Sequence, residues 1–210
     1  MYIMMYYSTK RKRNRNFLAE STLRFLYLEQ RKSMQEIGKI LHCSIHKISY
    51  WMLKYTITTR SWSEATYVKR NPGGDPFSFR KPANIKEAKL FGLGIGLYWG
   101  EGTNANLNSV RLGNTNAELI KKFMEFLVLF FQIEHNDLKF GLQLFTDIDS
   151  EVALDFWTKE LNIQRCQINR PVITKSVSKG TYRKKSKYGV MTVMYHNKKL
   201  RDLLVGLLPM

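Results

Sequence analysis

A single carboxylate closes the most apolar stretch of the sequence and is the first residue that could do chemistry. Glu101 is the one acid in the run LFGLGIGLYWGEG, from Leu90 to Gly102, in a chain whose net charge is +17. If this run is helical, Glu101 lies in the last turn, at the negative end of the helix dipole. A bound metal ion, a Lys or Arg side chain, or exposure to solvent would each offset that position. Glu101 is therefore a candidate metal ligand.

Glycines interrupt the same run at helical spacing. Gly92, Gly96 and Gly100 recur every four residues and would form one bare stripe on a helix, here called the glycine stripe. Each glycine inside a helix costs about 1 kcal/mol relative to alanine, and close approach of a second helix would offset that cost. We expect Gly102 to end the helix in a left-handed conformation. The opposite face should offer these residues to a core: Leu90, Phe91, Leu93, Leu97 and Tyr98.

The segment GIGLYWGEG, residues 94–102, resembles the LAGLIDADG motif of homing endonucleases. The matching residues are Gly96 and Leu97 at the motif's Gly and Leu, Gly100 at its small residue, and Glu101 with Gly102 at its Asp/Glu-Gly pair. The resemblance implies that the glycine stripe packs against its copy from a second subunit. It also implies that Glu101 and Gly102 bind Mg²⁺ or Mn²⁺ there, so that DNA cleavage requires a homodimer.

The resemblance spans residues 84–210 and implies an antiparallel, saddle-shaped sheet whose polar face contacts DNA. On that face Lys139 and Gln143 would orient the attacking water, and Arg111 would contact DNA. Three features depart from the family: Trp99 replaces the first acid of the motif, the first hairpin is short, and an additional helix lies between the later strands.

Periodicity in this half of the chain predicts alternating helices and strands, an α+β fold. We expect helices at 117–131, 149–163 and 197–208, and strands near 109–112, 138–145, 167–175 and 188–195. A basic segment lies between the last two strands, where a hairpin loop would be solvated or would follow the phosphate backbone of DNA. Its predicted DNA contacts are Lys179, Arg183, Lys184, Lys185 and Lys187.

The first part of the chain predicts helices only. Ser33 and Glu36 form the pattern of a capping box that starts a helix, and Ser44 caps a second helix after a tight turn. The segment resembles the bacterial and phage helix-turn-helix family, with Gly38 at the family's small-residue position, Leu41 and Ile48 at its core positions and W-x-x-K-Y at 51–55. One departure is His42, which occupies a turn position that is often glycine. The resemblance implies that the second helix enters the major groove of DNA. The predicted contacts are His46, Lys47, Tyr50, Lys54 and the following Arg60; alternatively, these residues form only the solvated face of a helical bundle.

Composition limits the class of protein and of partner. Lys and Arg number 34 against 17 Asp and Glu, so a polyanion is the natural partner. The longest apolar run is about half of the roughly 20 residues that span a bilayer, and the N-terminus does not match a secretory signal. We expect an intracellular, cytoplasmic protein associated with the nucleoid. Cys43 and Cys166 lack metal-type spacing and are expected to be reduced packing residues.

These patterns together predict a helix-turn-helix domain at 1–70, a linker at 71–85 and a LAGLIDADG-like endonuclease domain at 86–210. The predicted function is site-specific binding and Mg²⁺-dependent cleavage of double-stranded DNA by a homodimer. An alternative is a transcriptional regulator that binds DNA without cutting it, since one sporulation regulator family joins the same two domain types in the opposite order. An RNA partner in intron splicing would use the same basic surface and stays open.

Overall fold

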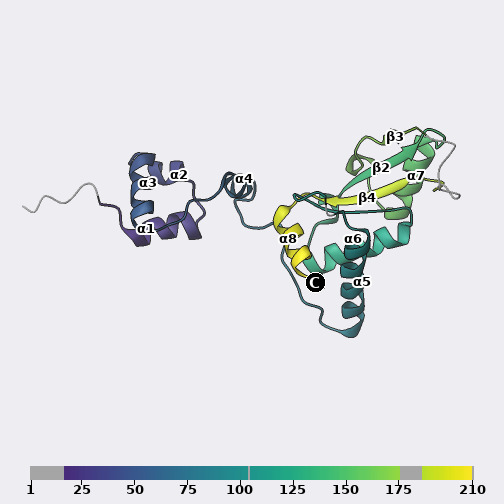
Figure 1. Cartoon of the computed structure of the whole chain (residues 1–210), viewed down its shortest axis with the longest axis horizontal. Helices are drawn as coiled ribbons and strands as arrows, with labels where there is room; N and C mark the ends of the chain where they lie inside the picture. Colours follow the sequence, from purple (N-terminus) through teal and green to yellow (C-terminus); the bar gives the residue numbers. More distant parts are fainter. Residues whose placement is uncertain (1–16, 104, 176–185, 210) are drawn as a thin grey trace, which may run out of the picture. The chain divides into compact units, whose positions relative to one another are not determined.

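The structure, a computed structural model, describes residues 17–103, 105–175 and 186–209 of the chain. It divides the chain into two units, Met1–Gly74 and Asp75–Met210, each of which is considered by itself below. Helices make up the described part of the first unit, and a mixed four-strand sheet interleaved with helices makes up the second (Figure 1). The α+β class predicted from the sequence is confirmed.

Five helical segments form the described part of the first unit. They are α1 (Glu20–Arg24), the π-helical turn η1 (Phe25–Glu29), α2 (Met34–Ile40), α3 (Ile45–Lys54) and α4 (Trp62–Arg70). The capping box that starts α2 is confirmed: the Glu36 amide donates to Ser33 Oγ, and the Ser33 amide donates to the Glu36 carboxylate. The Ser44 hydroxyl likewise accepts from the Lys47 amide at the start of α3. Helix α4 was not predicted, although Ser61 caps it in the same way at Glu64.

A small core holds α1, η1, α2 and α3 together. Its buried side chains are Leu23, Leu26, Tyr27, Ile37, Ile48, Met52 and Ile57. Leu23, Leu26 and Tyr27 share one helical face at i, i+3 and i+4 and are buried, whereas Leu28 is half exposed. No residue of α4 is buried, so this helix has no share in the core.

The second unit interleaves its helices with four strands. The helices are α5 (Ile85–Glu101), α6 (Ala117–Phe131), α7 (Ser150–Leu161) and α8 (Lys198–Gly206), with short 3₁₀ turns η2 (His135–Asp137) and η3 (Arg165–Gln167). The strands are β1 (Val110–Asn114), β2 (Lys139–Phe145), β3 (Val172–Thr174) and β4 (Val190–Tyr195). Asparagine or aspartate caps each of these four helices: Asn84, Asn116, Asp149 and Asn197.

The sheet order is β1-β4-β2-β3, and it corrects two expectations. The sheet is mixed rather than antiparallel, because β3 pairs with β2 in parallel. Helix α7 lies between these two strands in the chain, and such a crossover returns the chain to the starting end of the sheet. The last two strands are also not a hairpin, because β2 separates β3 from β4. The basic segment therefore joins two strands that are not neighbours.

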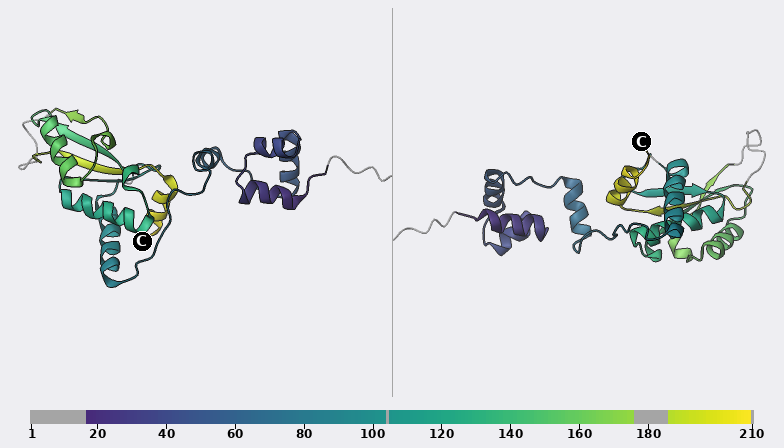
Figure 2. Two further views of the ribbon diagram at one scale, coloured as in Figure 1. Left: turned by 180° about the vertical axis from the view of Figure 1, so that it is seen from behind. Right: turned by 90° about the horizontal axis from the view of Figure 1, so that it is seen from below.

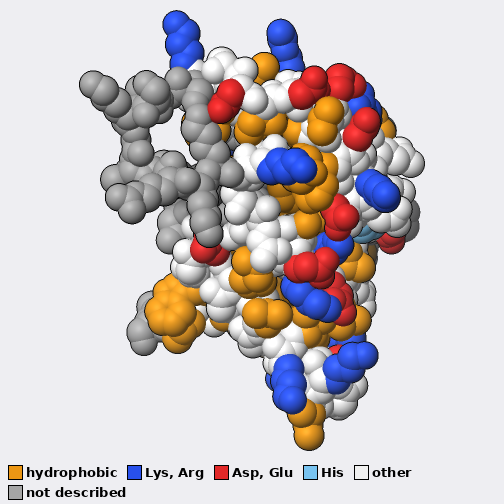
Figure 3. Space-filling view, turned by 90° about the vertical axis from the view of Figure 1, so that its right-hand side faces the viewer, with side chains coloured by type: hydrophobic (Ala, Val, Ile, Leu, Met, Phe, Trp, Pro, Cys, Tyr) orange, Lys and Arg blue, Asp and Glu red, His pale blue; other side chains and the backbone are white. Residues whose placement is uncertain are grey.

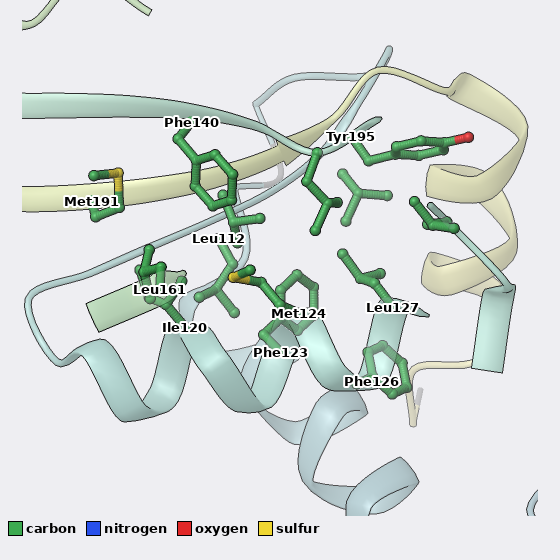
Figure 4. Packing of buried hydrophobic residues seen from close by; sticks show 14 of the residues in the cluster. Leu112, Ile120, Phe123, Met124, Phe126, Leu127, Phe140, Leu161, Met191 and Tyr195 are labelled. Atoms are coloured by element: carbon green, nitrogen blue, oxygen red, sulfur yellow. The ribbon is translucent and has the colours of Figure 1, made fainter. Parts of the chain in front are cut away.

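Helix α6 lies at the centre of the second unit, between the sheet and α5 (Figures 1 and 2). Leu112 and Phe140 of the sheet and Phe123 and Met124 of α6 fill the layer between them in Figure 4. Alternate strand residues point into this core, and the residues between them point to the opposite face of the sheet. We call that opposite face the open face.

Part of the expected linker belongs to the second unit. The Ser78 and Arg80 amides donate to the carbonyl oxygens of Phe131 and Phe130 at the end of α6. Phe79 stacks on Phe131 with ring centroids 5.5 Å apart. Residues 75–84 thus lie on the second unit, and the linker predicted at 71–85 is shorter than expected. None of the described helices is long and apolar enough to cross a membrane.

Candidate nucleic-acid interface

Helix α3 presents one polar face to solvent. Ile48 and Met52 are buried beneath it, whereas His46 and Lys54 are exposed and Tyr50 is 60% exposed. Lys54 Nζ lies 4.7 Å from the ring centroid of Trp51, whose ring stacks on Tyr55. Lys47 is half-buried on the same helix. Four of the predicted DNA contacts therefore lie on one helix with polar groups in reach of solvent: His46, Lys47, Tyr50 and Lys54.

The turn before α3 depends on the backbone contacts of Gly38 and on the backbone conformation of His42. A Cβ at Gly38 would lie 2.9 Å from the carbonyl oxygen of Cys43, so only glycine lets α2 approach the turn this closely. His42 adopts a left-handed conformation with φ of 50°. A non-glycine residue tolerates that conformation less readily, yet the turn forms with it. The spacing between α2 and α3 is thus fixed by backbone contact.

Arg60, predicted as a DNA contact, has partners within the first unit. Its guanidinium carbon lies 4.1 Å from the ring centroid of Tyr27, and its nitrogens donate to the carbonyl oxygens of Tyr27, Arg31 and Lys32. These carbonyls lie in η1 and just after it, where a cation stabilises the end of a helix. The guanidinium therefore helps to hold the first unit together, and its contact with DNA stays a prediction.

The glycines of α5 divide between two faces of the helix. Gly94 is buried, and a Cβ there would overlap the ring of Phe126 on α6. Each glycine of the glycine stripe has open space at the position of a Cβ, with no other group within 4 Å. Within one chain the stripe therefore packs against nothing that the structure describes. Leu93, expected in the core, is 43% exposed beside the stripe, and Trp99 is 59% exposed.

Glu101 is the last residue of α5, and its side chain is exposed. No hydrogen bond or ion pair of the described residues engages its carboxylate. Of the three ways to offset its position, solvent exposure is the one that a single chain displays. Gly102 follows with φ of −68°, so the predicted left-handed helix stop is wrong. Glycine is required there because a Cβ would overlap the carbonyl oxygen of Tyr98.

A metal at Glu101 would need ligands from outside one chain. The described residues contain no group of three or more His, Cys, Asp or Glu side chains placed to hold an ion. Mg²⁺ commonly takes one or two carboxylates and fills its remaining positions with water and phosphate oxygens. One exposed carboxylate therefore fits a site shared between two copies and a bound phosphate. Gly102 forms an isolated bridge with Leu112, so β1 lies directly beside the end of α5.

The open face of the sheet contains three of the predicted site residues, Arg111, Lys139 and Gln143. Arg111 of β1 pairs with Met194 of β4, and Met194 pairs with Lys139 of β2. Gln143 lies on the same face of β2, because it is four residues beyond Lys139. The sheet places β2 three strand spacings from Gly102, roughly 14 Å. Lys139 and Gln143 therefore do not lie beside Glu101 in one chain, and the structure does not support their predicted role toward its water.

Charges are distributed unequally over the second unit. On α6, α7 and η3 several acids and bases pair at 2.7–2.9 Å: Lys121 with Glu118 and Glu160, Lys122 with Glu125, and Arg165 with Glu151 and Asp155. Figure 3 shows such acidic and basic side chains interspersed over one side of the molecule. On the open face, by contrast, neither Arg111 nor Lys139 has an acidic partner among the described residues. That face is suited to an external anion.

Sequence reasoning missed His196 and Thr192 on the open face. His196 follows β4 and shares the face of Met194, since the two are two residues apart. Partial desolvation, Arg111 and Lys139 together lower the pKa of the His196 imidazole. Thr192 lies between Gly113 and Gly141 in the neighbouring row, where small side chains leave the sheet surface bare. The alternation of β4 places Thr192 and Met194 on the open face. Extending it by one step beyond the strand end places His196 there as well.

The basic segment lies largely outside the described residues: the predicted contacts Lys179, Arg183, Lys184 and Lys185 all fall at 176–185. Lys187 is described, and its Nζ lies 5.3 Å from the ring centroid of Tyr188. Tyr188 stacks on Phe156 of α7 at 3.8 Å, and its carbonyl oxygen accepts from Trp157 Nε1. The C-terminal end of the basic segment is thus anchored on α7.

Comparison with protein-family models, with curated proteins and with solved structures gave no match.

Proposed function

We propose that the protein binds double-stranded DNA at specific sites and cuts it as a homodimer with Mg²⁺ or Mn²⁺. The observation that carries the proposal is the open face, where Arg111 and Lys139 have no acidic partner among the described residues, whereas Lys121, Lys122 and Arg165 are paired with acids. Bases left without partners on one face are the electrostatic pattern of a nucleic-acid interface.

The first unit supports site-specific recognition. An exposed polar helix, α3, follows a turn that Gly38 and His42 keep tight, which is the arrangement that the helix-turn-helix resemblance implies. In this proposal α3 enters the major groove, where His46 and Tyr50 reach base edges while Lys47 and Lys54 reach phosphates.

The cleavage part rests on α5. Its glycine stripe has open space at every Cβ position, and the exposed Glu101 lies at the end of the same helix. Packing of two stripes would bring two Glu101 carboxylates to one interface, where they would hold the metal ions. Bound metal lowers the pKa of a water and stabilises the leaving oxygen of a phosphodiester.

Incubation of the full chain with a random-site duplex library tests the proposal. With Mg²⁺ or Mn²⁺ present we expect cut products that share a sequence, and with EDTA we expect the same sequence to be bound but intact. A library that is neither bound nor cut contradicts the whole proposal. Sequence-specific binding without cutting in either metal supports the second candidate instead.

That second candidate is a DNA-binding regulator without nuclease activity. One observation favours it: the described part of one chain contains no group of three or more His, Cys, Asp or Glu side chains that could hold a metal ion, at Glu101 or elsewhere. In this case the open face and α3 would keep their roles in binding, and Glu101 would be a surface acid.

A further inference from the structure

We propose that Arg111, Lys139 and His196 form one binding site for a backbone phosphate of DNA, and that His196 takes up a proton as the phosphate binds. The site rests on the DNA-binding function proposed above and adds a dependence on pH to it. We call it the sheet-face anion site.

Arg111 is held in a position that leaves its terminal nitrogens for a ligand. Its Nε donates to Ser109 Oγ at 2.8 Å, and the Ser109 hydroxyl donates to Asn106 Oδ1 at 3.1 Å. Ser109 is only 1% exposed, so the hydrogen bonds that hold Arg111 Nε are anchored in the protein interior. No other hydrogen bond joins the Arg111 guanidinium to the described residues. A guanidinium that is anchored through Nε presents Nη1 and Nη2, the pair that binds phosphate oxygens in a bidentate manner.

Lys139 and Arg111 lie on either side of the apolar side chain of Met194, which pairs with both in the sheet register and forms the apolar floor of the site. Met194 is 6% exposed, and its Cε lies 3.4 Å from the position of a Cβ on Gly141. The two Cα positions are two strand spacings apart, roughly 10 Å, a gap that the two long side chains can close around one anion. The apolar floor strengthens charge interactions above it, because it keeps water from one side.

His196 is the titrating member of the site. His196 is exposed, and its pKa is lowered by partial desolvation and by two cations, one on each neighbouring strand. None of the charges that shift this pKa is a carboxylate. In the free protein the imidazole is therefore mostly neutral at neutral pH. A phosphate bound between Arg111 and Lys139 reverses the local field and raises the pKa of His196.

The direction of the pH effect follows from this change. Because the complex binds more protons than the free protein, affinity rises as the pH falls through the pKa of the complex. It levels off below the pKa of the free protein. One proton changes affinity by about tenfold per pH unit at most.

The experiment measures binding of the full chain to a mixed-sequence DNA duplex at fixed salt, from about pH 8 to about pH 6. We expect the wild-type affinity to rise, and His196→Gln to reduce that rise by about threefold or more. His135→Gln, in the same unit, should keep the full rise, and His46→Gln reports the separate contribution of α3. An NMR titration of the imidazoles should show the pKa of His196 rising when the duplex is added.

An unchanged pH dependence in His196→Gln, with no rise in the pKa of His196 on the duplex, overturns the inference while leaving the proposed function intact. If the full chain binds no duplex at either pH, the proposed function fails instead. The NMR titration with inorganic phosphate then tests the anion site alone, and an unshifted His196 pKa overturns it.

Discussion

Individual residues of α5 serve different physical needs although many of them are glycine. Gly94 makes room for the Phe126 ring, and Gly102 makes room for the Tyr98 carbonyl oxygen, so contacts inside the chain require glycine at both positions. No such contact requires glycine at position 96. The sequence treats all of these positions alike, and only their surroundings separate them.

Alanine substitutions should separate the two kinds of glycine. We expect Gly94→Ala to lower the free energy of unfolding by about 1–3 kcal/mol, because its methyl group overlaps Phe126. Gly96→Ala is the matched control on the same helix and should raise the free energy of unfolding by up to about 1 kcal/mol through helix propensity. Urea denaturation of dilute protein measures both. Equal effects of the two substitutions would contradict the division of faces.

Glu101→Gln should abolish cleavage and leave DNA binding intact. Glutamine keeps the size of the side chain but lacks the charge that Mg²⁺ requires of its ligands. Folding should be unaffected, since Glu101 is exposed and unbonded among the described residues. Glu134→Gln, another exposed acid of this unit, is the control for charge and should cut normally. A Glu101→Gln protein that still cuts would remove Glu101 from the site.

At the scale of the element, α5 should act as an interface between two copies. Because Gly96 has open space at Cβ, Gly96→Leu should fold normally as a single chain but prevent two stripes from meeting. We expect monomers by analytical ultracentrifugation in the presence of DNA, where the wild type is dimeric. Gly206→Leu, also at an open helical glycine, should remain dimeric. A wild type that stays monomeric on DNA rejects the homodimer.

Helix α4 is the least supported helix of the described chain. It has nine residues, none of them buried, and Trp62 at its start is 93% exposed. Helices of this length are marginal in water without tertiary packing. We expect its amides to exchange hydrogen almost without protection, whereas those of α6 exchange slowly. Protection of α4 equal to that of α2 would show that a contact outside the described residues supports it.

The sequence predicts elements well where a local signal exists. The Ser33 and Glu36 capping box, the Ser44 cap and the strong periodicity of 117–131 each locate a helix by short-range chemistry. The parallel pairing of β3 with β2 has no such signal, because the connection through α7 decides it. The structural contacts of Arg60 lack a local signal for a similar reason: the carbonyls that it binds lie about 30 positions earlier in the chain.

At the scale of the whole molecule, the excess positive charge is shared between two units. Deleting residues 1–74 should weaken DNA binding and reduce the slope of log affinity against log salt, since the phosphate contacts of the first unit are lost. The second unit keeps its own core and should stay folded without the first. Circular dichroism checks that folding, and fluorescence anisotropy at several salt concentrations gives the slope. An unchanged slope would place all DNA contacts in the second unit.

The alternation of the strands has a consequence for how such a protein can diversify. Each core-facing residue of β1, β2 and β4 is followed by one on the open face, so the two sets occupy separate positions in the gene. Mutations at Arg111, Thr192 or Gln143 change the surface without altering the volume of the core. Under the proposed function, exchanges at Thr192 and Gln143 would change which DNA sequence the open face favours, and exchanges at Arg111 would change affinity, while the scaffold stays constant.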